Sequence, residues 1–337
     1  MICARRVFKC FKTLERWGNV VTGAAGPYFV ALAVILISMG TFCFFDVIAP
    51  NLSYPYISIP ICILIALNLF MHYFYVVTVK PGFIGEPPVE PGTSFLWAQK
   101  PGKGKQKALT GGVRWTSKGV RITPAGYTKC VKCASTRPER AHHCRICNKC
   151  VLKYDHHCPV RINQCVGLHN ERHFVMFMAY LVLSTFCLCI SGYPYFFESL
   201  GVTYIPWDHH VPEIMFAMIF ILSVVLCFAV GVMLGYHLYN ISWGETSVEA
   251  QDHEEYRRKA KIRNESFVNS YDLGKRKNLL FFFNIGEGGY SIITLFIPFR
   301  INPYTDGYSW ARQEGLERHQ GMRQGEELTD DENEDDV

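Results

Sequence analysis

Four long apolar segments constrain the fold of this chain more than any other feature. They run Tyr28–Phe45 with an extension past Asp46 to Ala49, Tyr54–Val79, Phe174–Phe197 and Ile214–Gly244, and apart from Asp46 they contain no Asp, Glu, Lys or Arg. Each is close to the ~20 residues that a spanning helix needs. The sequence therefore predicts an α-helical multi-pass membrane protein with four transmembrane helices, since buried helices of a soluble protein would need far more polar sequence to cover them.

The basic residues predict the orientation of these helices. All 34 Lys and Arg lie before the first segment, between Lys80 and Arg172, or after the fourth segment, whereas the loops Pro50–Ser53 and Glu198–Glu213 contain none. Because Lys and Arg near helix ends stay on the cytosolic side during insertion, both termini and the central loop are expected in the cytosol. The first apolar segment follows a basic stretch and has no small-residue cleavage site, so we expect this segment to be a retained anchor. The net charge of +5 follows from this topology, and we expect it to attract anionic lipid head groups.

Cysteine and histidine crowd into one part of the central loop. Seven of the 14 cysteines lie between Cys130 and Cys165, together with four histidines. A cytosolic loop is kept reduced, so this density favours metal binding over disulfides. A C-x2-C-x9-H pattern followed by a further cysteine occurs twice, fourteen residues apart, and predicts two interleaved Cys3His zinc sites. Their ligands would be Cys130, Cys133, His143 and Cys150 in one site, and Cys144, Cys147, His157 and Cys165 in the other.

Two closed four-ligand sites leave no open coordination position, so the zinc ions are expected to be structural. The spacing leaves the partition open, because Cys158 or His142 could replace one of the ligands.

Cys158 is the cysteine that the two predicted sites do not use. It ends the sequence Asp155-His156-His157-Cys158, in which an extended backbone would place His156 and Cys158 on one face and His157 on the other. A neighbouring imidazole that takes the thiol proton lowers a cysteine pKa from its free value of ~8.5, and Asp155 could orient that imidazole. The spacing alone also allows Cys158 to be a spare ligand or an inert buried thiol.

The segment from Cys130 to Phe174 resembles the DHHC cysteine-rich domain of protein S-acyltransferases. It contains C-x2-C-x4-P-x4-H-H-C-x2-C-x2-C-x4-D-H-H-C-P, followed by N-x-C-V-G and N-x3-F. The resemblance implies a palmitoyltransferase in which Cys158 takes a long-chain acyl group from acyl-CoA, such as palmitoyl-CoA, as a thioester. His156 would be the base, Asp155 would orient it, and the acyl group would pass to a membrane-proximal cytosolic cysteine of a substrate protein.

The same resemblance implies the two zinc ligand sets given above and an acyl chain held between the transmembrane helices. It also implies basic side chains at the CoA phosphates, for which Arg137, Arg140 and Lys149 are candidates. An endoplasmic reticulum or Golgi membrane is the expected location.

Two shorter segments resemble family motifs outside this domain. Thr246, Ser247 and Glu249 match a TTxE motif with serine in second place, and Asn269 begins a C-terminal motif in which asparagine packs the tail against the membrane core. These four residues are therefore expected to have structural roles.

One departure from the family pattern bears on activity. Val160-Arg161 stands where the family has a tryptophan, and Cys165 comes one residue late. A catalytically impaired, zinc-binding membrane adaptor is therefore the alternative function. A nucleic-acid module is disfavoured because no aromatic platform accompanies the fingers, and a transporter is disfavoured because His72 and His237 lack an acidic relay.

The expected organisation follows from these features. Residues 279–299 are apolar but interrupted by polar residues and glycines, so we expect them to lie partly buried at the membrane surface. The expected segments are a cytosolic N-terminus (1–26), helices 1 and 2 (27–79), a linker (80–126), the zinc domain (127–173), helices 3 and 4 (174–240), a membrane-associated region (241–300) and an acidic, disordered tail (301–337).

Overall fold

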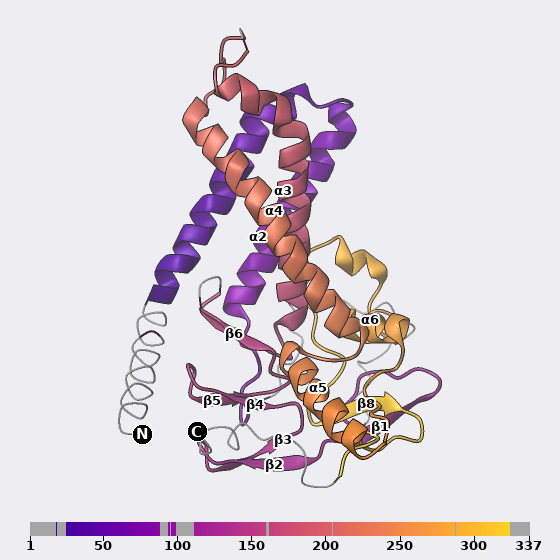
Figure 1. Ribbon diagram of the computed structural model, residues 1–337. Helices are drawn as coiled ribbons and strands as arrows, with labels where there is room; N and C mark the ends of the chain where they lie inside the picture. The colour runs from indigo at the N-terminus through magenta and orange to yellow at the C-terminus, as the bar shows by residue number, and fades with distance from the viewer. Residues whose placement is uncertain are drawn as a thin grey trace, which may run out of the picture.

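Four long apolar helices form one end of the molecule, and a region of short strands and helices forms the other (Figure 1). The computed structural model describes residues 18, 25–87, 94, 96–98, 111–159, 162–203, 205–286 and 288–323. The helices long enough to cross a membrane are Ala25–Asn51, α2 (Pro55–Thr78), α3 (Glu171–Ser199) and α4 (Glu213–Ser242). The predicted four-helix membrane fold, with the cysteine-rich region between the second and third helices, is confirmed.

The helices pack around α3, which contacts both α2 and α4. The first helix ends in a π-helical turn, η1 (Phe44–Ile48), and a 3-10 turn, η2 (Ala49–Asn51). Asp46, in η1, accepts a hydrogen bond from the backbone N–H of Val211 at 3.0 Å and lies 2.9 Å from His210 Nδ1. The only acidic residue of the first apolar segment is thus paired with the loop before α4.

Three antiparallel hairpins make up the cysteine-rich region. They are β2 (Tyr127–Cys130) with β3 (Ser135–Pro138), β4 (His142–Cys144) with β5 (Lys149–Val151), and β6 (His156–Cys158) with β7 (Gln164–Val166). Gly167 then leads toward α3 through a tight space, because a Cβ there would lie 2.6 Å from Val151 Cγ1 and 2.9 Å from the carbonyl oxygen of Leu152. The chain can therefore turn into α3 only with glycine at this position.

The C-terminal region packs against the cysteine-rich region. It contains α5 (Ser247–Ile262), α6 (Lys275–Phe283), the 3-10 turn η3 (Ile292–Leu295) and β8 (Ser309–Gln313). Strand β8 pairs with β1 (Val120–Pro124), which lies in the segment expected to be a linker.

The expectation of a disordered tail from residue 301 is wrong for residues 301–323. Trp310 is completely buried, and Ala311 and Arg312 beside it are nearly so. The reason is that this stretch carries aromatic and apolar residues that join the core, whereas the acidic run begins at Glu326. That acidic run, Glu326–Val337, lies outside the described residues.

Polar side chains of α2 and α3 hold the irregular segment around η3 against the bundle. Asn68, Tyr75, Arg172 and Tyr180 donate hydrogen bonds of 2.7–3.1 Å to the carbonyl oxygens of Phe296, Pro298, Thr294 and Leu295. Non-helical backbone is tolerated beside a membrane only where its carbonyl groups find such partners.

The same segment exposes apolar side chains. Ile292, Ile293 and Phe296 point outward and are more than half exposed. The location of this segment at the membrane surface stays a prediction.

Candidate active site and metal centres

The hairpins gather the predicted zinc ligands into two clusters. The candidate ligand atoms of Cys130, Cys133, His143 and Cys150 all lie within 4.8 Å of one another, and so do those of Cys144, Cys147, His157 and Cys165. His142 and Cys158 belong to neither cluster. Of the partitions that the spacing left open, the structure thus assembles the one with repeated Cys-Cys-His-Cys sets and without Cys158 or His142.

The distances within each cluster fit a tetrahedral zinc ion. In the first cluster, His143 Nδ1 lies 3.2–3.9 Å from its three sulfur atoms, and in the second, His157 Nδ1 lies 3.4–3.6 Å from its three. Zn–S bonds of about 2.3 Å and Zn–N bonds of about 2.0–2.1 Å place tetrahedral ligand atoms about 3.5–3.8 Å apart. The chain therefore has two sites that can bind metal ions, and their thiolate-rich composition suits zinc.

Each cluster is built from a turn of one hairpin and the strands of the next. Cys130 and Cys133 flank the β2–β3 turn, where the backbone N–H of Cys133 lies 3.4 Å from Cys130 Sγ, and Cys144 and Cys147 repeat this contact in the β4–β5 turn. The other two ligands of each cluster sit opposite each other on paired strands, as His143 does with Cys150 and His157 with Cys165. The repeated sequence spacing thus reflects a repeated hairpin.

The strand β6 separates His156 and His157 as its alternation requires. His157 joins the second metal cluster, whereas His156 Nδ1 lies 2.6 Å from Asp155 Oδ2 on the other side. His156 Nε2 is buried without a hydrogen bond of ordinary geometry, and it is the ring nitrogen left to interact with Cys158. Asp155, His156 and Cys158 therefore form a contiguous group outside both metal clusters.

The charges in this group favour an ionised pair. Burial alone would lower the pKa of His156, but its hydrogen bond with Asp155 and its interactions with the Cys158 sulfur and the Asp155 charge raise it to about 9. Burial would likewise raise the pKa of Asp155, whereas its hydrogen bond to His156 and the nearby imidazoles lower it to about 2. At neutral pH, Asp155 is thus a carboxylate that stabilises a protonated His156, which in turn favours a thiolate at Cys158.

The segment that resembles the TTxE motif holds Asp155 from the other side. The backbone N–H of Ser247 donates to Asp155 Oδ1 at 2.7 Å. Thr246 and Glu249 form a capping box at the start of α5, in which each side chain accepts the other residue's backbone N–H. The start of α5 is therefore fixed at the position from which it contacts Asp155.

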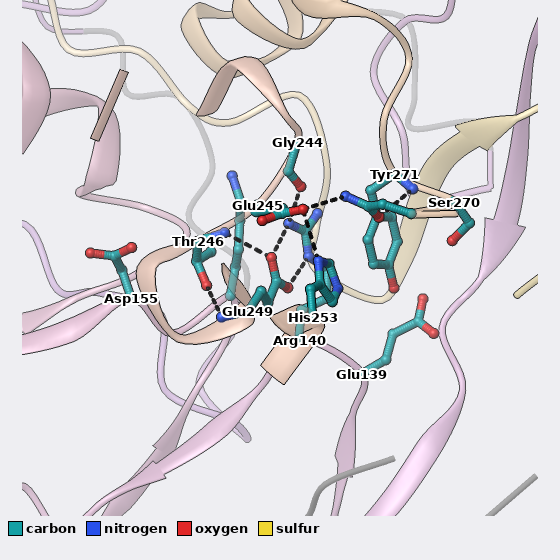
Figure 2. Close-up of polar contacts among 12 residues, drawn as sticks. Glu139, Arg140, Asp155, Gly244, Glu245, Thr246, Glu249, His253, Ser270 and Tyr271 are labelled. Atoms are coloured by element: carbon teal, nitrogen blue, oxygen red, sulfur yellow. Dashed lines mark hydrogen bonds and ion pairs between the residues drawn. The ribbon is translucent and has the colours of Figure 1, made fainter. Parts of the chain in front are cut away.

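A buried ion pair joins α5 to the cysteine-rich region (Figure 2). Arg140 contacts Glu249 through Nε at 2.5 Å and Nη2 at 2.7 Å, and it also donates to the carbonyl oxygen of Gly244. Its guanidinium lies 4.2 Å from the ring centre of Tyr271 and 4.6 Å from that of Trp310. Burial would lower the pKa of Arg140, but Glu249 raises it above its ordinary value.

These contacts change the expectation for the CoA phosphates. Arg140 is neutralised and enclosed by Glu249, and Arg137 is buried and donates to Thr128 Oγ1. Neither guanidinium is placed to meet a phosphate in solution. Lys149 remains exposed and lies over the ring of Phe83.

Removing one partner of the Arg140–Glu249 pair is expected to destabilise the protein. The two side chains are only 5% and 8% exposed, so Glu249→Gln leaves a buried, unpaired guanidinium, at a cost of about 3–5 kcal/mol. Thermal unfolding in detergent should show a clearly lower midpoint. The control is Glu255→Gln, which breaks the exposed pair with Arg258 on the same helix and should leave the midpoint unchanged. Equal midpoints for both variants would contradict a stabilising role.

An apolar cavity lies among the four long helices. Its lining includes Ile37, Leu69, Leu181 and Leu226. Leu69 also belongs to the buried apolar cluster that contains Cys158, Tyr73 and Phe174. Packed apolar side chains therefore connect the surroundings of Cys158 with the lining of this cavity.

Asn269 ties the C-terminal region to the end of α4. Its Nδ2 donates to the carbonyl oxygen of Trp243 at 2.9 Å, and its Oδ1 accepts the backbone N–H of Tyr271. Tyr271 links Asn269 to Arg140, a connection that the sequence does not predict, because its backbone N–H donates to Asn269 and its ring lies under the guanidinium. Val160 and Arg161, where the chain departs from the family pattern, lie outside the described residues.

Comparison with known proteins agrees with this geometry. Residues 124–254 match the family model of the DHHC palmitoyltransferases. This segment is a DHHC domain. The chain is 30% identical to human Palmitoyltransferase ZDHHC2 over 164 residues, which are 48% of this chain and 41% of that protein. It is 32% identical to Palmitoyltransferase PFA3 of Debaryomyces hansenii over 175 residues, again 41% of that protein.

A third relative, Palmitoyltransferase ZDHHC15 of Rattus norvegicus, is 35% identical over 125 residues, which are 35% of its length. The alignments thus span well under half of these curated relatives. The residues that match the family model, 124–254, include both metal clusters, so the recognition made from the cysteine pattern is confirmed.

Proposed function

We propose that this chain is a protein-cysteine S-palmitoyltransferase with Cys158 as its nucleophile. The observation that carries the proposal is the position of Cys158, which is left out of both metal clusters, interacts with His156 and opens onto apolar side chains between the helices. A thiol with an imidazole partner is suited to acyl transfer. The adjoining apolar cavity is suited to a long acyl chain.

The reaction would proceed in two steps. His156 takes the proton of the Cys158 thiol, and the thiolate attacks the thioester carbon of palmitoyl-CoA. The carbon–sulfur bond to CoA breaks, and the CoA sulfur takes the proton from His156. In the second step His156 takes the proton of a substrate cysteine, and the cysteine sulfur attacks the carbonyl carbon of the acyl-Cys158 thioester. The bond between this carbon and the Cys158 sulfur breaks, and Cys158 leaves as a thiolate. His156 then returns its proton to Cys158, which restores the thiol. Asp155 keeps His156 oriented throughout, through the contact of 2.6 Å.

Two zinc ions would be held by the Cys3His clusters. Four protein ligands close each site, so zinc would supply folding energy and fixed geometry, with no Lewis-acid part in the reaction. The second cluster adjoins β6, because its member His157 lies between His156 and Cys158. Thr246, Ser247, Glu249 and Asn269 would support this arrangement from α5 and the C-terminal region.

The placement of Cys158 also bears on the substrate. It belongs to the same buried cluster as Val76 near the end of α2 and Phe174 near the start of α3, which is the level at which the chain leaves the bundle. A substrate cysteine must reach this level, so proteins with membrane-proximal cytosolic cysteines are the proposed substrates. We place both termini and the DHHC domain in the cytosol, with the helices in an endoplasmic reticulum or Golgi membrane.

Acyl labelling of the purified chain tests the proposal. The wild-type protein should acquire a hydroxylamine-sensitive label from palmitoyl-CoA, whereas Cys158→Ser should acquire none and still contain two zinc ions. The matched control is Cys189→Ser, a half-buried cysteine of α3 outside both clusters, which should be labelled like the wild type.

Two results would count against this assignment. An unlabelled wild-type chain with full zinc content would favour the zinc-binding adaptor. A loss of about one zinc ion in Cys158→Ser would make Cys158 a ligand.

A further inference from the structure

A second histidine lies behind Asp155 and His156. His237, near the end of α4, places Nδ1 3.8 Å from Asp155 Oδ2, and its ring centre lies 5.7 Å from that of His156. Phe174 contacts both imidazoles edge to face, at 5.2 Å and 5.5 Å. His237 is only 7% exposed. This histidine is therefore fixed by packing in a position that faces the catalytic carboxylate.

The distance between His237 Nδ1 and Asp155 Oδ2 is too long for a direct hydrogen bond, and a water molecule in the cavity beside the pair can contact both groups. A cavity is lined by Asp155, His237 and Asn240, and Asn240 Nδ2 is buried without a hydrogen-bond partner. A water molecule needs two to four polar partners in such a place, and these three side chains supply them.

The other charged groups of this cavity are already paired. Lys153 contacts Glu171 at 2.6 Å, and Arg140 is held by Glu249. Among the described residues that line the cavity, His237 and Asn240 thus remain to support Asp155 from the side of α4.

We propose that His237 is a positioning residue, which holds the Asp155 carboxylate from α4 through a water molecule shared with Asn240. This inference rests on the proposed acyl transfer. It adds a residue of a transmembrane helix to the groups that position Asp155. Ser247 fixes Oδ1 of Asp155 and His237 restrains Oδ2, so the carboxylate keeps the orientation in which it holds His156.

The same face of α4 reaches the apolar cavity. Ser223 and Leu226 line that cavity, and His237 follows Leu226 by eleven residues, which is close to three full turns. One helix face therefore touches both the proposed acyl site and the carboxylate that orients the base.

Substitutions of His237 test the proposal through the kinetics of autoacylation. His237→Leu should lower kcat about 10- to 100-fold, as the loss of an orienting partner typically does, with little change in the KM for palmitoyl-CoA. His237→Asn should restore most of the rate, because its amide nitrogen is attached at the same carbon position as Nδ1. His237→Gln places its nitrogen farther out and should restore less. Asn240→Leu, which removes the second polar partner, should show a smaller loss than His237→Leu.

His72→Leu is the matched control, because His72 is an equally buried histidine of α2 that faces His173 and makes no contact with Asp155. It should keep the wild-type rate per zinc-loaded molecule. A wild-type rate in His237→Leu would overturn the inference, and so would a loss that His237→Asn does not restore.

Zinc content separates the remaining outcomes. Three zinc ions per wild-type chain would assign Asp155, His156 and His237 to a further metal site and overturn the positioning role. An unlabelled wild-type chain would overturn the proposed function, and this inference with it, whereas a labelled wild type beside an unaffected His237→Leu would overturn the inference alone.

Discussion

Cys133→Ser is expected to abolish folding of the DHHC domain, and activity as a consequence. The substitution removes one of four ligands from a closed site, and the binding free energy of such a site, on the order of 10 kcal/mol, is also folding free energy. The purified variant should contain less zinc, give a low yield of folded protein and be cut readily by protease within residues 127–166. His143→Ala should behave in the same way.

Cys227→Ser serves as the control for this experiment. Cys227 is a half-buried cysteine of α4 that belongs to neither metal cluster, so its loss should leave zinc content and protease resistance unchanged. Full zinc content and normal resistance in Cys133→Ser would show that the cluster is not a structural metal site.

His156→Ala is expected to slow autoacylation by about 10²–10⁴-fold at neutral pH while keeping both zinc ions. The pKa of His156 is raised to about 9, so below that pH the wild type holds a protonated imidazole beside the Cys158 sulfur. Without the imidazole, the thiol must ionise alone, with a pKa near ~8.5. The defect should therefore shrink as the pH rises from about 7 toward 9, because the mutant thiol then ionises without help.

His157→Ala provides the comparison on the same strand. It removes a metal ligand, so its defect should accompany zinc loss and should persist at high pH. Zinc content and autoacylation rates of both variants, measured across this pH range, distinguish the two roles. Zinc loss in His156→Ala with full zinc in His157→Ala would reverse them.

The sequence predicted the helices and metal clusters because their signals are local. A helix that crosses a membrane must be apolar along its whole length, and the members of each cluster lie at most 21 positions apart in a repeated pattern. The alternation of β6 likewise placed His156 and His157 on opposite sides, since it depends on three adjacent residues.

Contacts between distant segments could not be predicted in this way. Arg140 and Glu249 are 109 positions apart, so nothing near Arg140 in the sequence shows that its guanidinium is paired and is a poor candidate for the CoA phosphates. The pairing of β1 with β8 joins segments that were expected to be a linker and a disordered tail. The sequence showed no acidic partner for His237, because a lone histidine in an apolar helix carries no sign of a carboxylate 82 positions earlier.

The interleaving of the two metal clusters has a consequence for how the protein matures. His143 and Cys144 are neighbours on one strand but belong to different clusters, and the β4–β5 hairpin contributes ligands to both. An ion bound in either site would order this hairpin and so position candidate ligands of the other site, which would make the binding of a second ion more favourable than that of the first. Limited zinc supply in a cell would thus produce a mixture of fully loaded and empty chains with few half-loaded ones. Zinc scarcity would then lower the number of fully loaded molecules and leave the activity of each loaded molecule unchanged.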